Sequence, residues 1–259
     1  DGTAGVKESD DEVPVVEFKN AALKYSGAGD TSIAGVSFKA YRGQTIGIIG
    51  GTGSGKSSLV GLIPRFYDAT EGEVLIDGVN VKDIKLEELR DKVGIVMQKA
   101  VLFKGSIRNN MQVAKQDATD GEIDEALAIA QAKEFVDKKD GRLDYMIEQG
   151  GKNLSGGQRQ RLTIARAVVK KPDVLILDDS ASALDFATDA ALRKSIRTMP
   201  NNPTVFIVSQ RSASLMHADK IIVLDDGNVA GIGTHSELLA NCEVYREIYN
   251  SQFKSAKGA

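Results

Sequence analysis

Short apolar runs bounded by glycine and polar residues dominate the hydrophobic pattern of this 259-residue chain. The run TIGIIG at residues 45–50 is apolar almost throughout and ends in glycine, which is typical of a strand buried on both faces. Similar runs, DVLILD, TVFIVS and KIIVLDDG, begin at residues 173, 204 and 220. These segments predict buried strands in both halves of the chain.

Two further β regions are expected near the ends. Residues 13–24 are rich in β-forming side chains, and VSFKAYRGQ follows after a glycine-containing loop, so an antiparallel arrangement is predicted there. The pair Asp226-Gly227 predicts a hairpin between KIIVLDDG and NVAGIG. The polar, acidic residues 1–12 predict a solvated linker.

Helical spacing appears behind the glycine that ends TIGIIG, and again in the middle of the chain. Residues 119–139 carry an apolar stripe and predict one long helix with Asp120 as its N-cap, and residues 157–170 predict a second helix. The whole pattern predicts the α/β class, with a mainly helical insertion. The expected division is a core of residues 13–97 and 171–259, interrupted by a helical subdomain at 98–170.

Composition and net charge restrict the class of protein only modestly. Hydrophobic residues make up 42% and charged residues 27% of the chain, as in ordinary globular domains, and no run of 18 apolar residues occurs. The net charge of −3 does not favour nucleic acid as a partner. Cys242 cannot form an internal disulfide, because it is the single cysteine, and it is expected to be structural. A start at Asp1 suggests a fragment whose missing part could be a membrane domain upstream.

The segment GGTGSGKSS contains the pattern G-x-x-x-x-G-K-S between a predicted buried strand and a predicted helix. Glycines let backbone N–H groups approach phosphate oxygens, Lys56 would reach the β- and γ-phosphates, and the Ser57 hydroxyl would ligate Mg²⁺. This context predicts a P-loop NTPase core of the RecA-like kind. The residues expected to contact the phosphates are Gly50, Gly51, Thr52, Gly53, Ser54, Gly55, Lys56, Ser57 and Ser58.

Two adjacent carboxylates end the predicted strand VLILD. Asp178 has the position of the carboxylate that holds Mg²⁺ in such nucleotidases, directly or through water. Asp179 would then face the attacking water beside the γ-phosphate. The metal and the phosphates would supply the partners that two neighbouring like charges need.

The segment NLSGGQRQRLTIARA is more specific than the phosphate loop. Ser155, Gly156, Gly157 and Gln158 open a predicted helix, and their N–H groups would form a second anion site. Here the chain resembles the ATP-binding-cassette (ABC) family, whose signature is LSGGQ, over about residues 14 to 253. The resemblance implies that two such domains pair head to tail, with ATP held between the phosphate loop of one and the signature of the other.

The resemblance also implies roles for residues outside these motifs. Tyr25 would stack on adenine, and Gln98 would sense Mg²⁺ and the membrane domain. The segment from Ser182 to Asp185 would be the loop that crosses the dimer interface. VLFKGSIRNN, IEQGGKNLSGGQ and the C-terminal GTHSELLANCEVYREIYNSQF look like the exporter branch of the family.

Two positions depart from the family pattern. The residue after the metal carboxylate is normally Glu and is Asp179 here, and the family's γ-phosphate histidine is replaced by Gln210. His217 and His235 lie beyond that position and are expected to be structural or exposed. The two departures resemble the degenerate half of heterodimeric exporters, so this site would bind MgATP tightly and hydrolyse it poorly, while its signature completes the site of a different partner chain.

The function predicted on this basis is that of an ATP-binding and hydrolysing domain of an ABC exporter, at the cytoplasmic face of a membrane and joined to a transmembrane domain. One alternative is a regulatory clamp that binds ATP without hydrolysing it. A second is a soluble cassette ATPase acting on DNA or ribosomes, which the acidic balance and the lack of sustained heptads disfavour.

Overall fold

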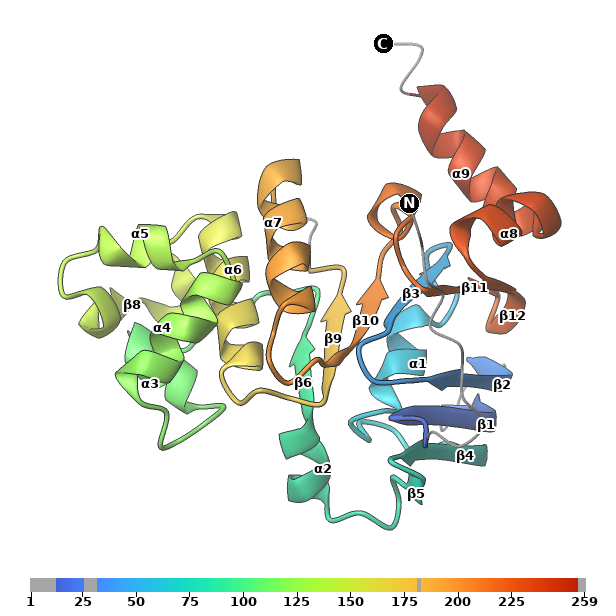
Figure 1. Ribbon diagram of the computed structural model, residues 1–259, viewed down its shortest axis with the longest axis horizontal. Coiled ribbons are helices and arrows are strands. Elements are labelled where there is room, and N and C mark those ends of the chain that lie inside the picture. Colours follow the sequence, from blue (N-terminus) through green and yellow to red (C-terminus); the bar gives the residue numbers. More distant parts are fainter. Residues whose placement is uncertain (1–12, 26–31, 181–182, 256–259) are drawn as a thin grey trace.

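A six-stranded sheet forms the centre of the protein (Figure 1). The computed structural model describes residues 13–25, 32–180 and 183–255. Five strands run parallel, and β12 pairs antiparallel with β11 at one edge. In order across the sheet, the strands are β12 (Asn228–Gly233), β11 (Lys220–Asp225), β3 (Thr45–Gly50), β10 (Thr204–Val208), β9 (Val174–Asp178) and β6 (Val93–Val96).

Both faces of this sheet are covered along its inner strands, which explains why β3, β9, β10 and β11 are almost continuously apolar. Along β9, Leu175 and Leu177 enter one hydrophobic core, and Val174 and Ile176 enter the other. The same alternation holds along β10 and β11. Because successive side chains of a strand point to opposite faces, a strand between two cores needs apolar residues at every position.

The predicted antiparallel region is present as a second sheet of order β2-β1-β4-β5. Its strands share one core with α1, and Phe18 stacks on Phe38 at a ring separation of 4.6 Å. These elements are β1 (Val16–Leu23), β2 (Ile33–Ala40), α1 (Lys56–Gly61), β4 (Glu71–Ile76) and β5 (Val79–Asn80). The exposed helix α2 (Leu86–Lys92) then leads into β6.

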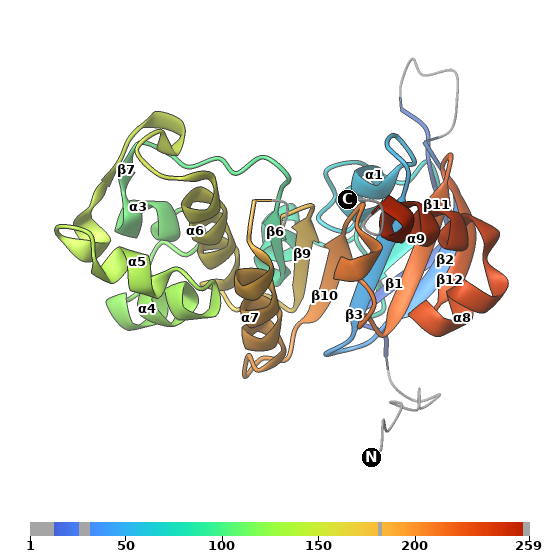
Figure 2. The same ribbon diagram turned by 90° about the horizontal axis from the view of Figure 1, so that it is seen from above.

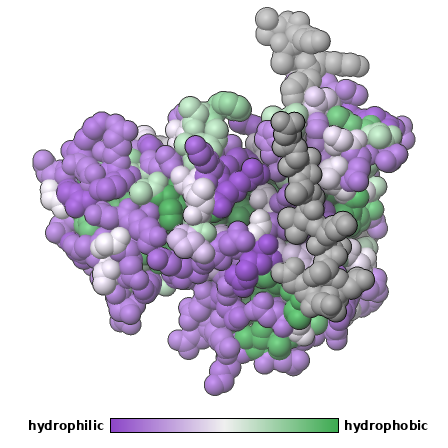
Figure 3. Space-filling view, in the orientation of Figure 1, coloured by the Kyte–Doolittle hydropathy of each residue, from purple (hydrophilic) through white to green (hydrophobic). Residues whose placement is uncertain are grey.

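A mainly helical block lies beyond the β6 edge of the central sheet in both views (Figures 1 and 2). Figure 3 shows that its visible surface is mostly hydrophilic. Its elements are β7 (Gly105–Ser106), α3 (Ile107–Gln112), α4 (Asp120–Ile129), α5 (Lys133–Asp137), η1 (Arg142–Asp144), β8 (Met146–Ile147), η2 (Gln149–Gly151) and α6 (Gly156–Val168). The exact subdomain boundaries at 98 and 170 stay a prediction.

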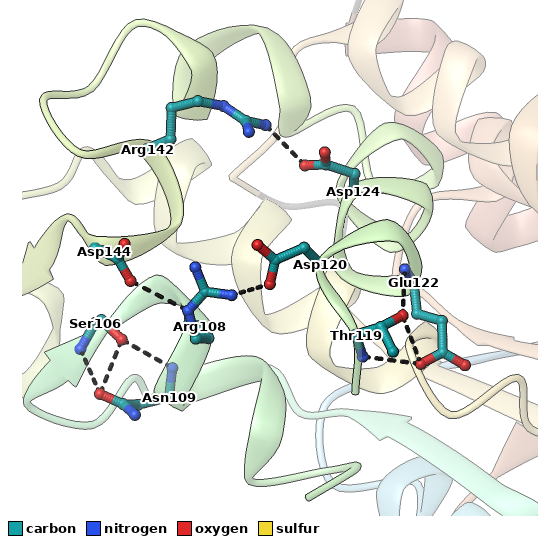
Figure 4. Close-up of polar contacts among 9 residues, drawn as sticks. All are labelled: Ser106, Arg108, Asn109, Thr119, Asp120, Glu122, Asp124, Arg142 and Asp144. Carbon is teal, nitrogen blue, oxygen red and sulfur yellow. Dashed lines mark hydrogen bonds and ion pairs between the residues drawn. The ribbon is translucent and has the colours of Figure 1, made fainter. Parts of the chain in front are cut away.

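The predicted helix at 119–139 is wrong in two respects. It is divided into α4 and α5 around Gln131, whose φ of 58° is left-handed and cannot continue a helix. The N-cap is Thr119 rather than Asp120, because the Thr119 side chain accepts a hydrogen bond from the Glu122 amide, and the Glu122 carboxylate accepts one from the Thr119 amide (Figure 4). The T-x-x-E spacing was the overlooked signal.

Asp120 instead pairs with Arg108 of α3 (Figure 4). Arg108 also donates to Asp144 of η1 at 3.1 Å, so one guanidinium joins three segments of the helical block. Exposed ion pairs of this kind contribute little stability each, and the buried apolar side chains of α3, α4 and α6 hold the block together.

The C-terminal elements complete the fold. They are α7 (Phe186–Arg197), η3 (Ser212–Ser214), α8 (His235–Asn241) and α9 (Glu243–Ser255). His235 Nδ1 lies 2.8 Å from the hydroxyl of the fully buried Tyr245, and Cys242 is buried against β12, which fits the structural roles predicted for His235 and Cys242. Of the helices that are described, none has the length and apolarity needed to cross a membrane.

Candidate nucleotide-binding site

A cavity of about 640 Å³ opens at the carboxyl ends of β3, β9 and β10. This is the edge at which parallel sheets of α/β proteins bind ligands. Most of the predicted phosphate, metal and catalytic residues meet here, although they come from distant parts of the chain. The cavity is lined by Tyr25, Ser32, Thr52, Gly53, Gly55, Lys56, Ser57, Ser58, Gln98, Asp178, Asp179, Val208, Ser209, Gln210, Asp226 and Gly227.

The loop after β3 has the backbone that a phosphate cradle requires. Gly53 and Gly55 have φ angles of 81° and 93°, which residues with a side chain rarely adopt. Gly50, Gly51 and Ser54 belong to the same loop but do not line the cavity. Lys56 Nζ donates to the carbonyls of Gly50 at 2.9 Å and Gly51 at 2.6 Å, and so links the start of α1 to the loop before it.

Lys56 is an unusual cation, because its residue is only 9% exposed. Burial lowers the pKa of its ammonium group, and the charges of Asp178 and Asp179 oppose that shift. The ammonium is therefore poorly hydrated and supported mainly by dipoles of the loop. Such a group gains more from a phosphate oxygen than a solvated lysine does.

The two carboxylates at the end of β9 have different environments. Asp178 is 5% exposed, and burial raises the pKa of its carboxyl group, with a further contribution from the charge of Asp179. Asp179 is half-buried with a left-handed φ of 46°, and its Oδ2 accepts a hydrogen bond of 3.2 Å from Gln98 Nε2. The abrupt backbone turn at Asp179 follows directly on the strand, at the mouth of the cavity.

The residues near Asp178 suit a magnesium ion. The Ser57 hydroxyl bonds to the Asp178 carboxylate, and Gln98 lines the same cavity. These are hard oxygen donors, and Mg²⁺ is typically held by one or two protein groups while phosphates and water complete its shell. The ionised carboxylate of Asp178 is disfavoured by burial and by the charge of Asp179, and a bound cation would stabilise it. Among the residues that the structure describes, no cluster of three His, Cys, Asp or Glu side chains forms a site of another type.

Asp178→Asn is expected to stabilise the empty protein near pH 7. Because the pKa of Asp178 is raised in the folded state above the unfolded value of about 3.9, its ionisation costs folding free energy once the pH rises past that value. The gain in Tm for Asp178→Asn should therefore be larger at pH 7 than at pH 4, measured by thermal unfolding without metal or nucleotide. An equal Tm difference at both pH values would contradict this account.

One wall of the cavity carries the predicted adenine residue. The Tyr25 hydroxyl lies 2.9 Å from Ser58 Oγ, and the Tyr25 ring packs edge-on against Tyr67 at 5.0 Å. The lining of the cavity also includes the turn of Asp226 and Gly227, which the sequence predicted only as a hairpin. Gly227 N–H donates to the Ser54 carbonyl at 3.3 Å, and no local sequence signal could have revealed that long-range contact.

The signature residues lie away from this cavity. Ser155 caps α6 by accepting from the Gln158 amide at 3.2 Å, and the Gln158 side chain accepts from the Ser155 amide at 3.1 Å. In both views α6 and α1 lie on different sides of β9 and β10 (Figures 1 and 2). Gly156 is exposed, and a Cβ on Gly157 would lie 3.2 Å from the Ala183 carbonyl.

Asp185 is likewise outside the cavity. Its carboxylate caps α7 by accepting from the Thr188 amide at 2.9 Å and the Thr188 hydroxyl at 2.7 Å. These hydrogen bonds lower the pKa of Asp185. Ser182 of the same segment falls outside the described residues.

The two arginines of the signature helix, Arg159 and Arg161, donate hydrogen bonds to backbone carbonyls. Arg159 donates to the Leu154 carbonyl at 2.7 Å, and Arg161 donates to the Gln131 carbonyl at 2.8 Å. Arg161 also lies over the Phe135 ring at 4.8 Å. Both guanidinium groups therefore hold the start of α6 against its neighbours in the helical block.

Comparison with known proteins identifies the architecture. Residues 33–182 match the family model described as ABC transporter, which is more than half of the chain. The chain belongs to the ABC transporter family. The ABC fold and the P-loop NTPase class predicted from the sequence are thus confirmed.

Two curated relatives and one solved structure illustrate the likeness. An uncharacterized ABC transporter ATP-binding protein of Mycobacterium tuberculosis is 44% identical over 245 residues, which are 93% of this chain and 42% of that protein. The ATP-dependent lipid A-core flippase of Haemophilus ducreyi is 38% identical over 250 residues, 96% of this chain and 43% of the flippase. A bacterial Atm1-family ABC exporter with ATP bound superposes with a TM-score of 0.87 at 33% identity, covering 92% of this chain and 42% of that chain.

This ABC chain is therefore an ATP-binding domain of the exporter kind. It spans about two-fifths of the length of the relatives it matches and accounts for a nucleotide-binding part of such proteins.

Proposed function

We propose that this domain powers export across a membrane by closing on MgATP with a second ATP-binding domain, and that its own phosphate-loop site hydrolyses ATP slowly. The proposal of slow hydrolysis depends on one observation, which is that Asp179 and Gln210 line the same cavity. Both positions depart from the family pattern at the places where the attacking water and the γ-phosphate would lie.

The carboxylate of Asp179 is poorly suited to activate water. One methylene fewer than Glu withdraws the carboxylate by about 1.5 Å, and a misplacement of about 1 Å can cost on the order of 10²-fold in rate. The hydrogen bond from Gln98 further occupies Asp179 Oδ2. Gln210 can donate a hydrogen bond to phosphate, but it cannot supply the positive charge of an imidazolium group.

The residues needed for binding are, in contrast, all present. Lys56 would neutralise phosphate charge, the N–H groups of the loop would donate hydrogen bonds to the phosphate oxygens, and Tyr25 would cover the base. Magnesium, held at Ser57 and Asp178 with Gln98 nearby, would polarise the phosphates. Tight binding combined with slow turnover is the property expected of this set of residues.

The exposed start of α6 supports a role toward a partner. Ser155 and Gly156 are exposed, and Ser155 is held in a capping box that orients the first turn of a 13-residue helix. Facing away from this chain's own cavity, that surface would cover the γ-phosphate bound by the partner domain. A partner domain with Glu and His at the positions that correspond to Asp179 and Gln210 would then contain the site that hydrolyses ATP rapidly.

An exposed apolar surface beside Gln98 supports a membrane-embedded partner. Met97, Val101 and Phe103 are 48%, 45% and 49% exposed, and Arg166 lies over the Phe103 ring at 5.4 Å. Several large apolar side chains left exposed within one short segment are typical of an interaction surface. We assign the contact to the transmembrane part of the exporter, which would place the domain at the inner membrane surface.

Restoring the family residues tests the proposal. In the transporter that contains this chain, Asp179→Glu combined with Gln210→His should raise single-turnover ATP hydrolysis at this site by roughly 10- to 100-fold, because the carboxylate advances toward the water and a cation reaches the phosphate. Asp225→Glu adds the same methylene at an exposed position outside the cavity and should leave the rate unchanged.

The outcomes separate the competing functions. An unchanged rate in the double variant would mean that Asp179 and Gln210 do not limit hydrolysis. Occluded ATP with no phosphate release, even in the restored variant, would favour a purely regulatory clamp. The likeness to exporter relatives gives no support to a cassette ATPase acting on DNA or ribosomes.

A further inference from the structure

The last helix of the described chain is hydrogen-bonded to the turn that carries Gln210. Gln252 Oε1 of α9 accepts from the Ser212 amide and from the Ser212 hydroxyl, each at 2.9 Å. Gln252 Nε2 donates to the Gln210 carbonyl at 2.6 Å. A single amide side chain thus satisfies three polar groups that lie 40 and 42 residues earlier in the sequence.

The hydrogen bonds from Gln252 reach the turn at its buried residue, Ser212. Ser212 is fully buried, so its amide and hydroxyl depend on Gln252 for the hydrogen bonds given above. On the cavity side, Ser209 Oγ accepts from the Arg211 amide at 3.0 Å. Gln210 lies between these two anchored points and is itself exposed at the cavity wall. The direction of its side chain therefore follows from how the turn is held.

Helix α9 is well placed to act as the support. It packs on β11 and η3, and Tyr245 in its first turn is fully buried. Figures 1 and 2 show α9 as the final element, beside β11 and beyond α8. Gln252 lies two turns after Tyr245, so the anchored first half of the helix positions the amide at its far end.

We infer that Gln252 is a positioning residue, which fixes the Gln210–Ser212 turn and so couples the docking of α9 to recognition of the γ-phosphate. The inference rests on the proposed role of Gln210 at that phosphate. Loss of the amide would leave a buried amide and hydroxyl unpaired and let the turn open. ATP would then lose its advantage over ADP, while contacts shared by both nucleotides would persist.

The test compares Gln252→Ala with Asn250→Ala in the full 259-residue chain. Asn250 is an exposed amide on the same helix, which makes its variant the matched control. Hydrogen exchange of the peptide spanning residues 209–214 should become roughly tenfold faster in Gln252→Ala alone. The ratio of Mg-ATP to Mg-ADP affinity, from calorimetric titration, should fall roughly fivefold, about the worth of one hydrogen bond.

Two further variants test the route. Gln210→Ala and the double variant Gln210→Ala/Gln252→Ala should give the same affinity ratio, because Gln252 acts through Gln210. Gln252→Glu keeps the acceptor for Ser212 and loses the donor to Gln210, so it should restore slow exchange only in part.

Unchanged exchange in Gln252→Ala would overturn the inference, and so would additive effects in the double variant. If Gln210→Ala left the ratio of Mg-ATP to Mg-ADP affinity unaltered, the proposed role of Gln210 at the γ-phosphate would be wrong, and so would its coupling to α9. Faster exchange in Gln252→Ala would in that case still show that Gln252 holds the Gln210–Ser212 turn.

Discussion

Lys56→Ala is expected to weaken MgATP binding by about 100-fold or more while changing the Tm of the empty protein little. Hydrogen bonds to charged groups are worth about 1.5–3 kcal/mol, and the lysine would reach two phosphates. The Tm should hold because burial already lowers the pKa of the ammonium group, so its charge is costly in the folded state. Nucleotide titration and thermal unfolding of the same preparations measure both effects.

Two comparison variants sharpen this result. Lys56→Met keeps most of the side-chain volume without the charge and should lose affinity to a similar extent. Lys82 also donates to a backbone carbonyl, that of Ala69 at 2.8 Å, but lies outside the cavity, so Lys82→Ala should bind ATP normally. Normal ATP binding by Lys56→Ala would remove the lysine from the phosphate site and require another cation there.

Gly55→Ala is expected to lower the free energy of unfolding by about 3 kcal/mol and to abolish ATP binding at concentrations that saturate the parent. Its φ of 93° is strained for alanine, and the new Cβ would lie 2.5 Å from the Ser32 carbonyl oxygen and 2.6 Å from Ile33 Cδ1. Left-handed strain costs about 1–3 kcal/mol and overpacking about the same. Relief of the clash would move the loop away from the phosphates. Denaturant unfolding and nucleotide titration test the two parts separately.

The same loop supplies graded controls. At Gly53 the φ of 81° is left-handed, but an added Cβ meets no described atom within 4 Å, so Gly53→Ala should show the strain alone, about 1 kcal/mol. At Gly51 there is neither positive φ nor any described neighbour within 4 Å, and Gly51→Ala should change stability by less than about 0.5 kcal/mol. Equal losses in all three variants would show that glycine flexibility, rather than the contact with Ser32 and Ile33, sets the loop.

The loop after β3 and the place of Asp178 at the end of β9 were predictable because the residues that form each of them are close together in the sequence. A buried strand, a turn of glycines and a lysine at the start of a helix are consecutive at residues 45–61, so the sequence pattern contains the geometry. Asp178 could be placed for the same reason, at the end of an apolar run. The central strands were readable because burial on both faces requires apolar residues throughout.

Errors arose where local alternatives were close in energy. Thr119 and Asp120 are both good N-caps, and the reciprocal hydrogen bonds of Thr119 with Glu122 decide for Thr119, which leaves the Asp120 carboxylate to pair with Arg108, 12 residues away. The break at Gln131 has no glycine or proline to announce it. Its side chain bonds to Ser195 Oγ of α7 at 2.9 Å, a contact that exists only after the helical block has met the core.

By itself, the sequence determined the class of fold, the phosphate cradle and the two departures at Asp179 and Gln210, since each is written in neighbouring residues whose backbone and side-chain chemistry act over a few ångströms. Only the tertiary structure decided that Asp179 is hydrogen-bonded to Gln98, that Gly227 supports Ser54, and that Gln252 of α9 holds the turn of Gln210. Those pairs are separated by 42 to 173 residues along the chain. Their partners are selected by the packing of sheets and helices, which no local pattern of residue types records.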